Sequence, residues 1–402
     1  MKIAIINQPT NNRGDEAAHR SLIRTLLKST SESKFYILFF GSDINSIKDM
    51  QVEDPRVQYI AIKEDKGTLR VLKLALYLHM EKFISKIFPC IKKYCSYIKE
   101  CDIILCAPGG ICMGGFQNWH HLAWLKFSKA LNKKIIYYSR SIGPFPLKSH
   151  SNRKFANISI ELLKYFSFLS LRDKRSMNLA DQLGVKYIPS IDTAFLDRPQ
   201  VKLPQDLIFK KYIVFVPNSL TWHPAYKNID QQKINNLYIR IANFILTSDL
   251  QAQIIMLPQL FNDKRKPDVS YFESLKSQIN NNRVIVLPET ISSDLQQMII
   301  SNSQFVIGAR YHSIVFAINN LKPFISLSYE HKMTGLLSLL QLNSRELNIS
   351  NIGENNFNEN EFLNKFKELY TSPLNYDMIK VCNKAHQIAQ NCFDIMKNEF
   401  LQ

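Results

Sequence analysis

The chain has 402 residues, of which 46% are hydrophobic and 21% are charged, a composition typical of a globular protein rather than a disordered one. Its length suits two domains of roughly 150–200 residues each. The seven cysteines are odd in number and form no C-x-x-C pair. They therefore predict neither a disulfide framework nor a zinc knuckle, and they favour a reducing compartment.

The net charge is +17, and the basic residues are spread along the chain. No arginine-rich arm, zinc finger or helix-turn-helix accompanies them, so we expect no nucleic-acid partner. Acidic substrates or an anionic membrane surface account for the excess. No stretch approaches the roughly 20 apolar residues of a membrane span, and the apolar run at 2–7 predicts a buried strand rather than a signal peptide. We therefore expect a cytoplasmic protein, with the inner face of the cell membrane as a further candidate location.

Short apolar runs alternate with helix-length amphipathic stretches in the first half of the chain. Strands are expected at 2–7, 34–40, 57–61, 102–107, 134–139, 167–171 and 186–188, and helices at 15–29, 118–132 and 174–183. Alternation of this kind is typical of βαβ units, which build a parallel sheet with helices on both faces.

One stretch departs from this pattern. Residues 66–100 carry eight Lys or Arg against two Glu, and their apolar residues recur at helical spacing. The pattern predicts one or two amphipathic helices with a basic polar face. Two interpretations stay open: a helix packed on the sheet with a solvated lysine face, or a peripheral contact with an anionic membrane.

The alternation restarts after the proline- and aspartate-containing stretch 196–206. Strands are expected at 212–216, 253–257, 284–287, 304–307 and 323–326, and helices at 234–247, 292–301, 311–319 and 333–340. The predicted fold class is α/β, with two Rossmann-like domains facing a cleft. Their expected bounds are 1–196 and 211–375, followed by a C-terminal helix at 376–402 that packs back across the domains. Ligands of parallel sheets collect outside the carboxyl ends of the strands, so the cleft is the default site.

The segment 305–317 carries the sharpest functional signal. A buried strand ends at Ile307, Gly308 lets the chain turn, and Arg310 and His312 begin a helix. An arginine fork binds carboxylate or phosphate bidentately, and a helix N-terminus adds its own partial positive charge. The next strand ends near Ser326, which brings Lys332 to the same opening. We expect an anionic, phosphorylated small substrate here.

Two segments of the first half also follow strands. Asp15 lies where the first strand meets the first helix, and two interpretations are open: a helix cap, or a ligand contact at the Gly14 turn. Gly109 and Gly110 belong to a glycine-rich loop that would let a ligand approach the backbone. That loop is not G-x-G-x-x-G, so no dinucleotide is expected.

Trp119, His120 and His121 follow the glycine-rich loop and would offer an aromatic platform and two imidazoles to a sugar. Adjacent histidines do not share a helix face, and no further ligand set accompanies them, so no metal is expected.

Arg172 and Asp192 follow later strands of the same half. Arg172 either contacts a ligand or pairs with Asp173, and Asp192 either acts at the site or caps a turn.

Taken together, these segments resemble the polysaccharide pyruvyl transferase family. The matching pieces run in order from about residue 3 to about 340: Gly14-Asp15-Glu16, Gly109-Gly110, Ile142-Gly143-Pro144, Arg172-Asp173 with Ser176, Leu183-Gly184-Val185, Asp192-x-Ala-Phe195 and Gly308-Ala-Arg310-Tyr-His312-Ser313, completed by Pro323, Tyr329, Lys332 and Gly335. One departure is Ile111, which stands where the family often has a third consecutive glycine.

The resemblance implies a GT-B-like fold in which the N-terminal domain binds the acceptor and the C-terminal domain the donor. The donor would be phosphoenolpyruvate, a co-substrate rather than a cofactor. The acceptor would be a hydroxyl pair on a surface polysaccharide or its lipid-linked precursor, and the product a pyruvate ketal. The donor would be held by Arg310, His312, Arg172 and Lys332, with His312 as general acid and Asp192 as base. The acceptor side would be Asp15, Gly109, Gly110, Trp119, His120 and His121.

Two other function classes remain open at this point. A GT-B glycosyltransferase could use Arg310 and His312 to hold the diphosphate of a nucleotide sugar. A non-catalytic, membrane-associated assembly factor could use the fold for binding alone, although the presence of Arg310, His312 and Asp192 argues against a degenerate site.

Overall fold

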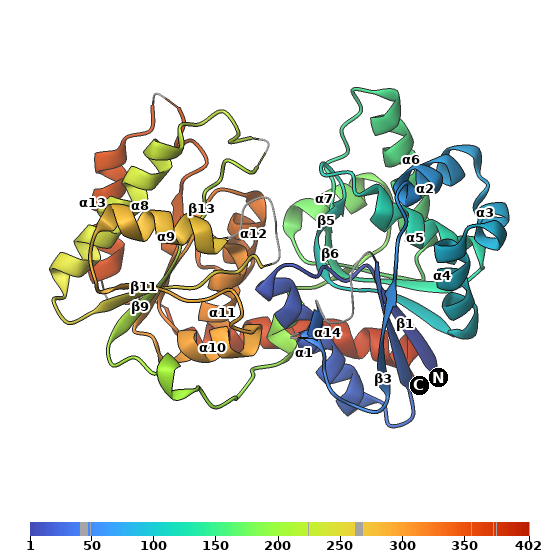
Figure 1. Cartoon of the computed structure of the whole chain (residues 1–402), viewed down its shortest axis with the longest axis horizontal. Coiled ribbons are helices and arrows are strands. Elements are labelled where there is room, and N and C mark those ends of the chain that lie inside the picture. Colours follow the sequence, from blue (N-terminus) through green and yellow to red (C-terminus); the bar gives the residue numbers. More distant parts are fainter. Residues whose placement is uncertain are drawn as a thin grey trace. The chain divides into compact units, whose positions relative to one another are not determined.

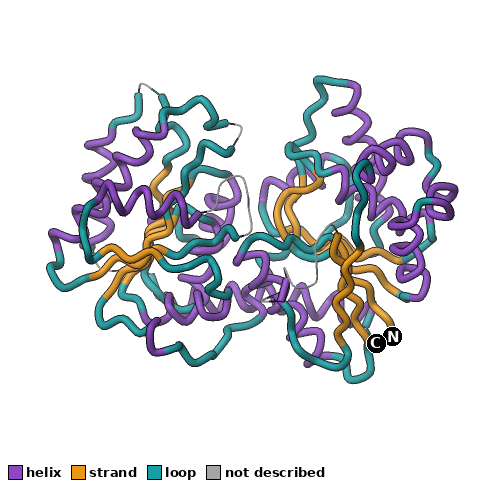
Figure 2. The backbone as a smooth tube through the Cα atoms, in the orientation of Figure 1, coloured by secondary structure: helices purple, strands orange, loops and turns teal. Residues whose placement is uncertain are grey.

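The computed structural model describes residues 1–40, 47–48, 50–223, 225–261, 268–354, 356–372, 374 and 376–401. The chain forms two compact units. Unit 1 comprises Met1–Thr10, Ala18–Asp197 and Gln387–Gln402, and unit 2 comprises Asn11–Ala17 and Arg198–His386. Each unit contains one parallel sheet with helices around it, so the predicted α/β class is confirmed (Figures 1 and 2).

Unit 1 contains a sheet of eight parallel strands. They are β1 (Lys2–Ile6), β2 (Lys34–Phe40), β3 (Val57–Ile62), β4 (Ile103–Cys106), β5 (Gly109–Met113), β6 (Lys134–Ile142), β7 (Phe168–Leu171) and β8 (Ile188–Pro189). The order is β3-β2-β1-β4-β6-β7-β8, with β5 paired to β6. The chain leaves β1 in one direction and returns to β4 on its other side, which makes the carboxyl ends of β1 and β4 a topological switch point.

The helices of unit 1 bury their apolar faces against this sheet. They are the part of α1 (Arg13–Ser29) from Ala18 onward, α2 (Thr68–Leu78), α3 (Glu81–Ile87), α4 (Pro89–Glu100), α5 (Trp119–Ala130), α6 (His150–Tyr165), α7 (Lys174–Gln182) and the later part of α14 (Met378–Phe400). Leu72, Ile91 and Trp124 share one buried cluster with strand residues such as Ile104. Apolar burial on this scale is the main stabilising contribution to such a unit.

Unit 2 contains six parallel strands. They are β9 (Tyr212–Val216), β10 (Gln253–Met256), β11 (Val284–Val286), β12 (Phe305–Gly308), β13 (Phe324–Ser328) and β14 (Glu346–Asn348), in the order β11-β10-β9-β12-β13-β14. The helices are α8 (Gln231–Ser248), α9 (Asp268–Ile279), α10 (Ser293–Asn302), α11 (Tyr311–Asn319), α12 (His331–Leu340), α13 (Glu359–Thr371) and the start of α14. Here the switch point lies at the carboxyl ends of β9 and β12.

Two local predictions are corrected. The predicted glycine-rich loop contains a strand, β5, because β6 continues to Ile142 and offers it a pairing edge; Met113 accepts a hydrogen bond from the Gly143 N–H at 2.7 Å. The segment 66–100 forms three helices rather than one or two. His79 ends α2 in the left-handed conformation, and Pro89, which has no N–H to continue α3, begins α4.

Residues 11–17 were predicted with the first domain but belong to unit 2. The Arg13 N–H donates to the Gln259 carbonyl at 2.8 Å, and the Phe261 N–H donates to the Asn11 carbonyl at 3.1 Å. These backbone bonds join the start of α1 to the segment after β10, which sequence spacing cannot predict.

In the ranges that the structure describes, no helix has both the length and the apolar character needed to cross a bilayer.

Candidate functional site

The carboxyl ends of β9, β12 and β13 carry most of the polar side chains that the sequence singles out in unit 2. The predicted strand–turn–helix is present: β12 ends at Gly308, Arg310 is the N-cap residue of α11, and His312 lies in the first turn of α11. Gly308 is required here because a Cβ atom on it would lie 2.0 Å from the Ser313 hydroxyl. That hydroxyl donates to the Arg310 carbonyl at 2.5 Å and closes the turn.

Arg310 is buried and forms an ion pair with Asp268, the first residue of α9. The other carboxylate oxygen of Asp268 accepts the backbone N–H groups of Gln259 and Leu260, both at 3.0 Å. Burial lowers the pKa of Arg310, but Asp268 together with Tyr329 and Tyr238 outweighs this effect, so the net pKa is raised. Arg310 is therefore a fixed cation with one edge of its guanidinium held by Asp268.

The loop after β9 adds residues that the sequence reasoning missed. The Trp222 ring lies 5.8 Å from the Arg310 guanidinium, and its indole N–H donates to Asn218 at 2.9 Å. Asn218 is fully buried and also accepts the Leu220 N–H at 3.2 Å. The available signal was positional, because Asn218 follows a buried strand just as Arg310 does.

Glu330 lies between His223 and Lys332, next to Trp222. Glu330 lies 3.3 Å from Nε2 of His223 and 2.8 Å from Nζ of Lys332. Burial raises the pKa of Glu330, but Lys332 and His223 outweigh it and the net pKa is lowered. Nδ1 of His223 accepts the Ala225 N–H at 3.2 Å, so the ring proton of neutral His223 lies on Nε2, facing Glu330. Nε2 of neutral His223 thus faces Glu330, and Nδ1 is held by the Ala225 N–H.

His312 is buried next to the first turn of α1. A Cβ atom on Gly14 would lie 1.8 Å from Nδ1 of His312, so the imidazole rests directly on the Gly14 backbone. The Tyr311 ring lies 5.0 Å from His312 and 6.0 Å from Nζ of Lys332. Unit 2 thus brings Arg310, His312 and Lys332 into one neighbourhood.

The first turn of α1 is anchored in unit 2 by a buried ion pair. Arg13 and Glu16 meet at 2.5 Å, and the second oxygen of Glu16 accepts the Ser293 N–H, at the start of α10, at 2.8 Å. Burial raises the pKa of Glu16, and Arg13 offsets only part of that rise. The guanidinium of Arg13 also donates to the Glu289 carbonyl at 2.6 Å. This network holds Gly14 against His312.

Asp15 does not cap α1. The N–H groups of Gly14 and Asp15 donate to the Asn12 side chain at 2.7 and 3.3 Å, so Asn12 is the cap. Asp15 is partly exposed in the first turn of α1, one residue from the His312 contact.

In unit 1, Arg172 pairs with Asp192 at 2.5 Å, not with Asp173. Asp173 instead caps α7 by accepting the Ser176 N–H at 2.9 Å. Asp192 has no exposed surface, and its other oxygen accepts the Ala194 N–H at 3.0 Å. Asp192 is therefore enclosed within unit 1, and its role as a base stays a prediction. Arg172 is also buried, about as deeply as Arg310, and its contact with a donor stays a prediction.

Gly109 lies against a further arginine near the carboxyl end of β6. Arg140 is fully buried, and a Cβ atom on Gly109 would lie 2.9 Å from its guanidinium, whereas one on Gly110 would meet open space. Arg140 donates to the Ala107 carbonyl at 2.8 Å and approaches Cys112 at 3.3 Å. Gly109 therefore allows close packing within the unit, and Gly110 offers open backbone.

The predicted aromatic platform is not exposed. Trp119 and His121 are buried: Trp119 stacks on Tyr77 at 5.6 Å, and His121 packs edge-on against Tyr137 at 5.8 Å. Burial holds the pKa of His121 well below its usual range. Both are packed in unit 1 by these aromatic contacts, and their role in binding an acceptor stays a prediction. His120 is partly exposed and lies 3.6 Å from Glu64.

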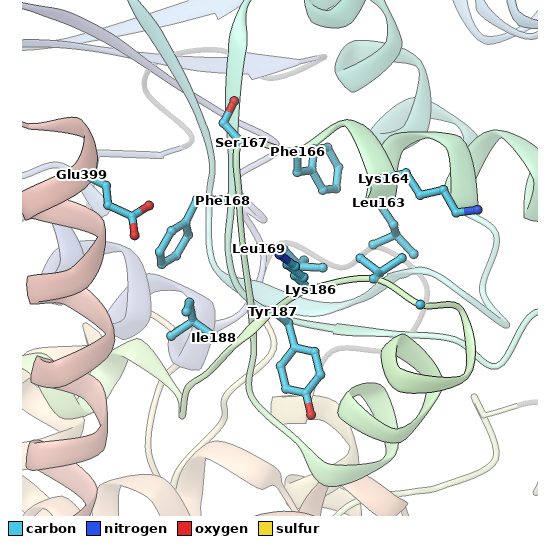
Figure 3. A pocket seen from close by; sticks show the side chains of 12 residues that line it. Leu163, Lys164, Phe166, Ser167, Phe168, Leu169, Lys186, Tyr187, Ile188 and Glu399 are labelled. Carbon is cyan, nitrogen blue, oxygen red and sulfur yellow. The ribbon is translucent and has the colours of Figure 1, made fainter.

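A cavity of about 560 Å³ in unit 1 includes none of these residues. Figure 3 shows Phe168 and Leu169 of β7, Tyr187 and Ile188 of the segment that forms β8, and Glu399 of α14 around it. The cavity begins at the amino end of β7, whereas ligands of parallel sheets bind at carboxyl ends. We therefore place the candidate site with Arg310 and His312 and not in this cavity.

Residues 12–331 match the family described as polysaccharide pyruvyl transferase. The chain is also similar to "Amylovoran biosynthesis protein AmsJ" of Erwinia amylovora, with 21% identity over 369 residues, 85% of this chain and 86% of AmsJ.

Two similar solved structures show the fold. The UDP-GlcNAc 2-epimerase of Neisseria meningitidis, bound to UDP-GlcNAc, has a TM-score of 0.60 at 10% identity and covers 100% of both chains. Anabaena HepE, in complex with UDP-glucose, has a TM-score of 0.54 at 12% identity, covering 100% of this chain and 95% of HepE. The fold is accordingly GT-B-like.

Proposed function

The chain belongs to the polysaccharide pyruvyl transferase family, and we propose that its donor is phosphoenolpyruvate and its product a pyruvate ketal. The acceptor in this proposal is a hydroxyl pair on a surface polysaccharide or its lipid-linked precursor. The observation that carries the proposal is the pairing of Arg310 and His312 at the start of α11, beside Lys332.

The charges of unit 2 suit this donor. Phosphoenolpyruvate carries a carboxylate and a phosphate, and a guanidinium binds either group bidentately. Asp268 holds Nη2 of Arg310, and among the described residues Nε of Arg310 has no hydrogen-bond partner. The backbone N–H groups at the start of α11 add partial positive charge, and Lys332 supplies a second cation. This cationic set would hold the donor without a metal ion.

Ketal formation requires protonation of the methylene carbon of phosphoenolpyruvate and attack on C2 by two acceptor hydroxyl oxygens in turn. In the proposal His312 gives a proton to the methylene carbon C3, which makes C2 electrophilic. The first acceptor hydroxyl forms a C–O bond to C2 and loses its proton. The C2–O bond to phosphate then breaks, inorganic phosphate leaves, and the second hydroxyl closes the ketal as its proton is released. One phosphoenolpyruvate and one diol thus yield one ketal and one phosphate.

The acceptor side of the proposal uses the residues that the structure leaves accessible. Asp15 and His120 are partly exposed, and Gly110 offers open backbone. Residues 66–100 are the region through which the protein would meet a membrane that carries a lipid-linked acceptor.

The test is to incubate the protein with phosphoenolpyruvate, then add a panel of soluble saccharide diols and measure inorganic phosphate. Acceptor-dependent phosphate release that persists in EDTA supports the proposal. Consumption of a UDP-sugar in place of phosphoenolpyruvate would instead favour the glycosyltransferase alternative.

A further inference from the structure

Helices α2 and α3 expose large apolar side chains that the core does not use. Leu74 and Leu78 of α2 are 53% and 56% exposed, and Phe83 and Ile87 of α3 are each 55% exposed. Each pair is spaced i, i+4, so its members lie together on one face of their helix. Single exposed apolar residues are ordinary on protein surfaces, whereas here two such pairs lie on consecutive helices that contact each other. We refer to the two pairs together as the apolar patch.

The opposite faces of these helices already fill the core. Leu72 and Leu76 of α2 and Ile84 of α3 are buried in the cluster under the sheet. Helix α4 behaves differently, because its apolar residues Ile91 and Ile98 are buried. The exposed apolar residues are therefore a feature of α2 and α3, at the margin of unit 1 in Figure 1, and not of the whole basic segment.

The exposed charges on α2 and α3 themselves have one sign. Arg70, Lys82 and Lys86 are exposed. The acidic residue of these two helices, Glu81, is only 6% exposed and faces Lys126 at 3.8 Å. Lys154 of α6 approaches His79, at the end of α2, at 3.4 Å and extends the cationic rim. The surface therefore combines apolar side chains with cations and no exposed carboxylate on either helix.

We propose that this surface docks on a membrane that contains anionic lipids. We call it the α2–α3 surface and define it by Arg70, Leu74, Leu78, Lys82, Phe83, Lys86 and Ile87. The apolar side chains would enter the boundary between headgroups and acyl chains, and the cations would meet lipid phosphates. A protein partner would need a complementary acidic and apolar face, whereas an anionic bilayer supplies both properties at once. The inference rests on the proposed function only in that a lipid-linked acceptor lies at such a surface.

The experiment measures co-sedimentation with vesicles of phosphatidylcholine alone and of phosphatidylcholine with phosphatidylglycerol. The wild type should bind the anionic vesicles and detach as salt rises, because exposed charges are screened. Lys82→Gln with Lys86→Gln should weaken the partition coefficient on the order of tenfold or more. The matched control is Lys92→Gln with Lys93→Gln on α4, which removes the same charge without an adjacent apolar patch and should bind like the wild type.

A second variant tests the apolar contribution. Phe83→Ser with Ile87→Ser should weaken vesicle binding by a similar factor and leave the thermal melt unchanged, since both side chains are already exposed. Phosphate release with a soluble acceptor should be unchanged in all variants, so failure of docking is distinguishable from failure of the proposed chemistry. Equal vesicle binding by the wild type, both surface variants and the control would overturn the inference. A wild-type dimer in light scattering that Phe83→Ser with Ile87→Ser converts to a monomer would also overturn it, by assigning the surface to a second copy of the chain.

Discussion

Replacing Gly14 by alanine tests whether the first turn of α1 sets the position of His312. A Cβ atom on Gly14 would lie 1.8 Å from Nδ1 and 1.9 Å from Cγ of His312, whereas real Cβ contacts are essentially never shorter than 3.0 Å. The imidazole and the helix turn must therefore separate by about 1 Å or more, and misplacement of a catalytic group by that distance lowers a rate on the order of 100-fold. We expect kcat for phosphate release to fall by about that factor, with a smaller change in the KM for phosphoenolpyruvate.

The free energy of unfolding of Gly14→Ala is a second, independent measurement of the same contact. Alanine in place of glycine at an open helical position would stabilise the fold by roughly 0.5–1 kcal/mol. Overpacking against His312 should cost about 1–3 kcal/mol, so Gly14→Ala should lower the free energy of unfolding instead of raising it, which urea unfolding can measure. Gly115→Ala is the matched control, because a Cβ atom there meets nothing within 4 Å. A folded Gly14→Ala protein with wild-type kcat would refute the reasoning, since His312 would then be either unmoved or unnecessary.

Arg310→Lys keeps the charge but loses the bidentate guanidinium, so the KM for phosphoenolpyruvate should rise at least tenfold. His312→Asn should instead lower kcat on the order of 100-fold, with less effect on KM. Steady-state kinetics in which both variants change kcat and KM equally would contradict this division of roles. Asp268→Asn leaves Arg310 buried without its counter-charge and should destabilise unit 2 by about 3–5 kcal/mol. Phosphoenolpyruvate should then raise the melting temperature of this variant more than that of the wild type, and an equal rise would contradict the pairing. Burial lowers the pKa of His19 to about 3, so the unfolded chain binds the extra proton and stability should fall as pH drops below about 6.5. Between pH 7 and 5 His19 should account for a loss of about 2 kcal/mol in the free energy of unfolding, measured with urea. His19→Gln should abolish that loss, and an unchanged pH dependence in the variant would contradict the burial of a neutral His19.

The segment around Arg310 and His312 could be predicted because its signals are local. A buried apolar run, a glycine and a polar pair before an apolar helix determine strand, turn and helix within fifteen residues of one another. The parallel sheets were predictable for the same reason, since alternation of short and long apolar patterns is a property of neighbouring residues. The predicted strand ends consequently showed which sequence segments lie at the carboxyl edge of each sheet.

The partners of the site residues could not be predicted, because they are set by tertiary packing. Arg310 meets Asp268 across 42 positions of sequence, and Arg172 meets Asp192 across 20. A sequence shows that Asp192 follows a strand, but not that its carboxylate is enclosed by Arg172 and a backbone N–H. The same limit applied to Trp119, whose position after a glycine-rich segment suits a sugar platform and a core residue equally well.

The most direct test of the central claim joins donor, acceptor and product in one measurement. The purified protein is incubated with phosphoenolpyruvate and a saccharide that carries a suitable hydroxyl pair, and released phosphate and saccharide mass are followed together. The account predicts one phosphate for each saccharide converted, with a product mass equal to saccharide plus pyruvic acid minus water, and loss of both signals in His312→Asn. Conversion of the saccharide with a UDP-sugar as donor, with phosphoenolpyruvate left intact across the acceptor panel, would contradict it.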